Sequence, residues 1–113
     1  MNTSDTFVKL KAAREYLVLL PGLKTYKDFD IAIEIGHHEK IGKPLSLKQL
    51  LLLEVGAPST VQRHLNKLIK NGLVIKGSHA SNQRIVQFTL SEKAHKSFIS
   101  CYKQLQQVLS DFS

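Results

Sequence analysis

Side chains that can hydrogen-bond to nucleic-acid bases are concentrated in one short stretch of this sequence, residues 58–71. An arginine can donate two hydrogen bonds to guanine, and the amide of glutamine or asparagine can pair with adenine. Hydroxyl and ammonium groups suit phosphate oxygens instead. The stretch therefore predicts contacts to DNA, in which the arginine and amide side chains read base edges. The residues expected to contact DNA are Ser59, Thr60, Gln62, Arg63, Asn66, Lys67 and Lys70.

The same stretch has the apolar spacing of an amphipathic helix. One face of a helix with 3.6 residues per turn would carry Val61, Leu65, Leu68 and Ile69. The opposite face would carry the polar and cationic side chains. Gly72 follows where a left-handed residue often closes a helix. We expect a recognition helix that anchors its apolar face and presents its polar face to the major groove.

Two β-branched runs follow, at residues 73–76 and 84–89, and predict a β-hairpin. The polar tip of this wing, from Gly77 to Arg84, is expected to lie along the DNA backbone. Arg84 could enter a narrow minor groove there.

Upstream, a capping box of Ser46 and Gln49 predicts a short helix over 47–54. Gly56 turns the chain, and Pro58 suits the first position of the next helix. Short helix, turn, helix and hairpin together predict a winged helix-turn-helix. The fold class is mainly α with a small β-hairpin wing (α+β), in a single domain spanning residues 1–113.

Three further helices are expected, over residues 5–20, from Thr25 to about Glu39, and over 92–110. The second should bury the face that carries Phe29, Ala32, Ile33 and Gly36. The first and last have broad apolar stripes, which hint at a second partner surface. We expect them to form a homodimer through Phe7, Leu10, Leu17, Phe98, Tyr102, Leu105 and Leu109.

Charge is distributed unevenly along the 113 residues. The formal net charge is +7. Residues 45–90 contain six Lys or Arg and one acidic residue, Glu54, and no acidic residue occurs from Val55 to Ser91. Such a bias favours a polyanionic partner, although many basic domains bind nothing.

The single cysteine, Cys101, excludes an internal disulfide and suits a reducing compartment. No secretory signal is visible, and no run approaches the roughly 20 apolar residues that span a bilayer. The sequence therefore predicts a cytoplasmic protein without membrane contact. Cys101 fits a packed apolar stripe better than a redox switch.

Three motifs resemble the MarR family of bacterial transcription regulators. They are PLSLKQL at 44–50, STVQRHLNKLIKNGLV at 59–74 and SNQRIVQFTLSEKA at 81–94. The resemblance covers about residues 25–98. It implies a homodimer held by the terminal helices, with recognition helices in successive major grooves. Carried over singly, Ser59, Thr60, Gln62 and Arg63 match the family's DNA-contacting stretch, and Arg84 matches its wing arginine. A small-molecule effector stays open and unidentified.

The sequence is also compatible with two other functions. A winged helix can serve protein contacts, and a replication or plasmid-maintenance factor would use the same DNA chemistry. An enzyme is not expected, because no catalytic pair, phosphate-cradling glycine loop or metal spacing appears. Adjacent histidines such as His37 and His38 point about 100° apart on a helix, so no metal site and no cofactor is predicted.

Overall fold

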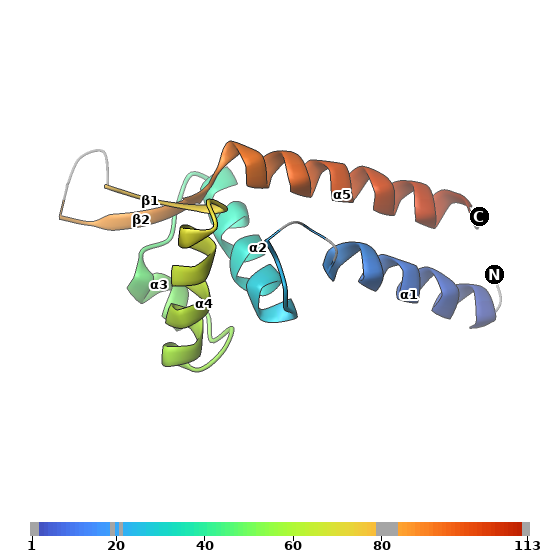
Figure 1. Cartoon of the computed structure of the whole chain (residues 1–113), viewed down its shortest axis with the longest axis horizontal. Coiled ribbons are helices and arrows are strands. Elements are labelled where there is room, and N and C mark those ends of the chain that lie inside the picture. The colour runs from blue at the N-terminus through green and yellow to red at the C-terminus, as the bar shows by residue number, and fades with distance from the viewer. Residues whose placement is uncertain (1–2, 19, 21, 79–83, 112–113) are drawn as a thin grey trace.

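The computed structural model describes residues 3–18, 20, 22–78 and 84–111, which form five helices and one hairpin (Figure 1). The predicted fold class, mainly α with a small β-hairpin wing, is confirmed. α1 and α5 lie side by side and extend away from the rest of the molecule, opposite the hairpin. The elements are α1 (Thr3–Val18), α2 (Tyr26–Lys40), α3 (Leu47–Leu52), α4 (Pro58–Lys70), β1 (Val74–Ser78), β2 (Val86–Leu90) and α5 (Glu92–Asp111).

Helix α2 is the central helix, since it packs against α1, α3, α4 and β2. It begins as predicted, with the Thr25 hydroxyl accepting a hydrogen bond from the backbone N–H of Asp28 at 3.1 Å. Its predicted buried face was partly wrong. Ile31, Ala32 and Ile35 are buried, whereas Ile33 is 41% exposed. Apolar residues lie around most of this helix, so that their spacing does not single out one face.

The helix-turn-helix consists of α3 and α4. The capping box of Ser46 and Gln49 is present in both directions. α3 ends at Leu52, two residues earlier than the predicted Glu54. Glu54 instead adopts a left-handed backbone with φ of 56°, which ends the helical path. The predicted apolar stripe of α4 is confirmed, because Val61, Leu65 and Leu68 are almost fully buried.

The hairpin pairs β1 with β2 antiparallel, from Val74 opposite Leu90 to Ser78 opposite Val86. Both strands begin later than the predicted runs at 73 and 84. Leu73 is instead part of the helix closure, where Gly72 has φ of 76° and the Leu73 N–H donates to the Leu68 carbonyl. A further short pairing, outside the hairpin, joins the Phe88 N–H to the Leu45 carbonyl at 2.9 Å. Most of the predicted wing tip, residues 79–83, lies outside the described residues.

The terminal helices agree with the predicted spans to within about two residues. The Ser91 hydroxyl caps α5 by accepting from the Ala94 N–H at 3.1 Å. The inner side of α5 packs against α1 and the core through Ala94, Phe98, Cys101 and Leu105. Within the described part of the chain, no helix is long and apolar enough to cross a membrane.

Candidate nucleic-acid interface

The polar face of α4 is assembled in one place, as the sequence predicts. Its buried stripe fixes the helix to the core, so the opposite face must point outward. Gln62, Arg63 and Asn66 are exposed there. The remaining predicted residues of this helix are exposed or half-buried beside them: Ser59, Thr60, Lys67 and Lys70.

The start of α4 is left open to a ligand. Its N-cap is Ala57, which has no side-chain oxygen and makes no capping hydrogen bond, and Pro58 has no N–H. Side-chain hydroxyls cap α2, α3 and α5. The first backbone donors of α4, those of Ser59 and Thr60, are therefore available to a phosphate.

The electrostatics of α4 and the hairpin are one-sided. From Val55 to Ser91 the chain has no carboxylate side chain, while Arg63, Lys67, Lys70, Lys76 and Arg84 are cationic. Arg84 is exposed just before β2. All five of these side chains are exposed or half-buried, and a local excess of positive charge of this kind favours a polyanionic ligand.

Two polar contacts, one from α2 to the turn before α4 and one from α2 to α4 itself, were not predicted from the sequence. The Lys27 ammonium donates to the Val55 carbonyl in the turn before α4. The carboxylate of Asp28, which is fully buried, lies 2.6 Å from Nδ1 of His64 on α4. Asp28 and His64 are 36 residues apart, so the sequence gives no local signal that they pair.

The predicted dimerisation residues fall into two groups. Phe7, Leu10, Tyr102 and Leu109 are half or more exposed, at 65%, 58%, 62% and 50%. The other three pack against the core of their own chain: Leu17, Phe98 and Leu105. The exposed group therefore offers an apolar surface, while the packed group supports the helices that present it.

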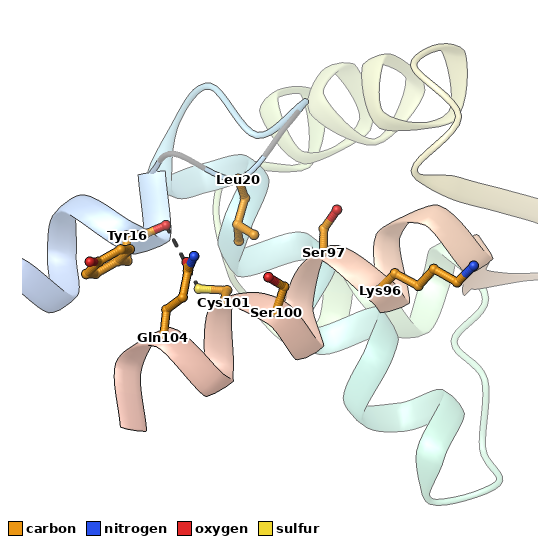
Figure 2. A pocket seen from close by; sticks show the side chains of 7 residues that line it. All are labelled: Tyr16, Leu20, Lys96, Ser97, Ser100, Cys101 and Gln104. Carbon is orange, nitrogen blue, oxygen red and sulfur yellow. Dashed lines mark hydrogen bonds between the residues drawn. The ribbon is translucent and has the colours of Figure 1, made fainter. Parts of the chain in front are cut away.

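A hollow of about 500 Å³ lies between α1 and α5, lined by Tyr16 and Leu20 on one side and by Ser100, Cys101 and Gln104 on the other (Figure 2). Burial raises the pKa of the Cys101 thiol, because the charged thiolate loses solvation. The Sγ atom lies 3.9 Å from the Tyr16 carbonyl oxygen. Cys101 is therefore part of the helix packing, as its place on the apolar stripe predicts.

Among the residues that the structure describes, no group of three histidine, cysteine or carboxylate side chains could hold a metal ion. His38 Nδ1 lies 2.9 Å from the Glu34 carbonyl oxygen. Glu39 turns to the other side, where its carboxylate contacts His95 on α5 at 3.0 Å. His38 and Glu39 thus contact different partners, the Glu34 carbonyl and His95.

The arrangement defines a winged helix-turn-helix protein in which α4, the second helix of the helix-turn-helix, presents a polar, cationic face. No protein-family model matches the sequence, and no curated protein is significantly similar to it. Solved structures do share its fold. The crystal structure of RV1404 from Mycobacterium tuberculosis has a TM-score of 0.77 and 14% identity, over 96% of this chain and 71% of that chain.

Two further solved structures have a similar fold. A MarR mutant from E. coli, complexed with operator DNA, has a TM-score of 0.65 and 17% identity, over 96% of this chain and 74% of that chain. The transcriptional regulator BldR from Sulfolobus solfataricus has a TM-score of 0.57 and 20% identity, over 98% of this chain and 84% of that chain. The fold of this chain is the MarR-like winged helix.

Proposed function

We propose that this chain is a transcription regulator that binds double-stranded DNA sequence-specifically as a homodimer. The observation that carries the proposal is the exposed face of α4, where Gln62, Arg63 and Asn66 lie together on a helix anchored by its buried stripe. An α-helix fits the major groove, and these three side chains suit the edges of guanine and adenine.

The phosphate contacts fall on both sides of that face. At the start of α4, Ser59 and Thr60 offer hydroxyls and uncapped backbone donors. Further along the helix, Lys67 and Lys70 supply positive charge. Arg84 approaches the backbone or minor groove from the hairpin. A protein-binding winged helix has no need for a segment this free of carboxylates, so DNA is the better-supported partner.

The homodimer is supported by a second apolar stripe on α5. Ile99, Tyr102 and Leu109 recur at helical spacing and are each half or more exposed. They lie beside the inner stripe that packs on α1. On α1, Phe7 and Leu10 are also exposed, at 65% and 58%. Patches of this kind mark interfaces, and a two-fold dimer buries the same patch on both chains.

DNA binding of this kind needs no catalysis and no cofactor. We place it in the cytoplasm, a reducing compartment in which the Cys101 thiol is stable. The MarR mutant of similar fold is complexed with operator DNA, which makes duplex DNA the first ligand to test here.

Selection of binding sites from a random duplex library tests the proposal. We expect a palindromic site whose half-sites are about one DNA turn apart, because a two-fold dimer presents two copies of α4. A variant with Gln62, Arg63 and Asn66 all changed to alanine is the control, and it should enrich no site while keeping weak, salt-sensitive binding. Failure of the wild-type chain to enrich any site would contradict the proposal.

A further inference from the structure

We infer that the first turn of α2 is a clamp that sets the orientation of the recognition helix for base reading. Lys27 holds the turn that leads into α4, and Asp28 holds α4 itself through His64. The inference rests on the proposed function, since it concerns how accurately α4 meets DNA. It makes Lys27, Asp28 and His64 positioning residues rather than DNA contacts.

Asp28 is built into the protein with both carboxylate oxygens engaged. Its side chain is fully buried. One carboxylate oxygen accepts from the Lys24 backbone N–H at 3.1 Å, and the other lies 2.6 Å from Nδ1 of His64. One proton is shared between the Asp28 carboxyl oxygen and Nδ1 of His64, which lie at hydrogen-bond distance. This contact holds the ring of His64 in one direction.

Lys27 adds a second point of attachment next to the first. Its ammonium group donates to the Val55 carbonyl, in the turn between α3 and α4. The lysine chain passes so close to Gly56 that a Cβ there would lie 3.0 Å from Nζ and 3.3 Å from Cε. A side chain at Gly56 would require the end of Lys27 to shift by a few tenths of an ångström, so the turn and Lys27 lie in close contact.

The clamp supplies a kind of control that the apolar stripe cannot supply. Contacts of Val61, Leu65 and Leu68 are non-directional. The hydrogen bond between His64 and the buried Asp28 carboxyl adds a direction, because such a bond weakens as its angle and distance depart from the preferred values. His64 directly follows Arg63, and fixing its ring fixes the rotation of the helix that carries the base-reading side chains. Displacements of about 1 Å are enough to spoil a preorganised site.

The molecule contains a matched control at the other end of α2. There Glu39 accepts from the Leu90 backbone N–H at 2.9 Å and lies 3.0 Å from Nε2 of His95. This carboxylate–histidine pair joins α2 to β2 and α5, away from α4. Its loss should reduce stability without changing how α4 meets DNA.

The first test compares three variants by urea unfolding and by affinity for two duplexes, the site recovered by selection and a random duplex of equal length. His64→Leu removes the donor and strands the Asp28 carboxylate. We expect its ratio of selected-site to random-site affinity to fall about tenfold, the loss of one well-placed base contact. His95→Leu should lose stability but keep the wild-type ratio. His64→Asn retains an amide donor near the Nδ1 position, so it should restore most of the ratio.

The second test needs no change in the buried core. Lys27→Met keeps the aliphatic chain and removes the ammonium group, while Lys24→Met removes one charge from an exposed side chain nearby. Both should weaken binding to random DNA by a similar small factor, since each removes one cation. Only Lys27→Met should lower the ratio of selected-site to random-site affinity.

The outcomes separate the inference from the proposed function. If the wild-type chain enriches a site and His64→Leu and Lys27→Met keep its ratio, the clamp is wrong and the proposed function stands. A ratio that falls equally in His64→Leu and His95→Leu shows general loosening and overturns the clamp. A wild-type chain that prefers no site contradicts both.

Discussion

The winged helix and the pair of terminal helices treat their apolar residues in opposite ways. In the winged helix, Ile31, Ile35, Leu50 and Leu68 are completely buried. On α1 and α5, residues as large as Phe7 and Tyr102 are more than 60% exposed, at 65% and 62%. The first region has a fully buried core, and its exposed apolar residues, such as Ile41, Leu52 and Ile75, are spread over separate elements. The second region carries its exposed apolar residues on two adjacent helices.

The difference is one of pattern as well as of area. Leu52 of the winged helix is 71% exposed, but it stands at the end of a six-residue helix. On α5, in contrast, Ile99, Tyr102 and Leu109 recur between residues 99 and 109 of a 20-residue helix, beside the inner stripe. A helix with two apolar stripes has two partners. One is α1 of the same chain, and our proposal makes the other a second chain.

Leu68→Ala should produce the largest loss of stability, because it creates a cavity in the buried core of the winged helix. We expect the free energy of unfolding to fall by about 2–5 kcal/mol, measured by urea unfolding with circular dichroism. The loss should be the same at low and high protein concentration. A loss below about 1 kcal/mol would mean that this core is not packed as described.

Tyr102→Glu tests the other region. A charge buried in an apolar interface should weaken the dimer by about 2 kcal/mol or more, measured by sedimentation. Leu105→Glu is less informative, because Leu105 also packs against the core of its own chain. Gln107→Glu, exposed on another side of α5, is the matched control and should remain dimeric. A dimeric Tyr102→Glu variant with unchanged affinity would remove the outer stripe from the interface.

Arg63→Ala tests whether the exposed face of α4 in the winged helix reads DNA bases. We expect a loss of about 1–3 kcal/mol on the selected site, with relaxed preference at one base pair. Lys70→Ala is the control, and it should weaken selected and random duplexes alike and lower the salt slope by about one. Equal losses for Arg63→Ala on both duplexes would make Arg63 a phosphate contact.

Arg84→Ala should have a smaller effect, since the wing lies beside the recognition helix. Binding should weaken by less than about 1 kcal/mol on sites with G·C flanks and by more on A·T-rich flanks, where the minor groove is narrow. Fluorescence anisotropy on paired duplexes that differ only in their flanks measures this. Identical wild-type and variant affinities on both would exclude Arg84 from the interface.

The smallest effect concerns Cys101, between the two terminal helices. Burial raises its pKa in the folded state, so folding disfavours the thiolate. The associated stabilisation is fully present below the unfolded-state pKa and is lost as pH rises through the folded-state pKa. We expect iodoacetamide to label the native chain more slowly than the urea-unfolded chain at the same pH. Equal rates would show that the thiol is accessible.

The sequence pattern was sufficient to predict a helix and its buried face where a single residue spacing dominates. The stripe of Val61, Leu65 and Leu68 and the closing Gly72 have the period and termination of a single helix, and the structure reproduces both. The capping box at Ser46 is equally local. Helix α2 was harder, because it is surrounded by four elements and its apolar residues show no single period.

The exposed residues of the candidate site could be predicted from the sequence, but the buried contacts that hold α4 in place could not. Exposed side chains such as Arg63 can be recognised because their positions follow from the helical pattern. The pairing of Asp28 with His64 joins residues 36 apart and depends on how α2 crosses α4. In the sequence Asp28 looks ordinary, since an acidic residue in the first turn of a helix is common. Only the fold reveals that this one is buried.

The central claim is that the exposed stripes of α1 and α5 pair two chains so that two copies of α4 read one DNA site. The stoichiometry of the complex with the selected duplex tests this most directly, by sedimentation at saturating protein. We predict two chains per duplex for the wild-type protein, with contacts centred about 34–36 Å apart, and loss of this complex in Tyr102→Glu. A saturated complex with one chain per duplex and full sequence preference would contradict the account.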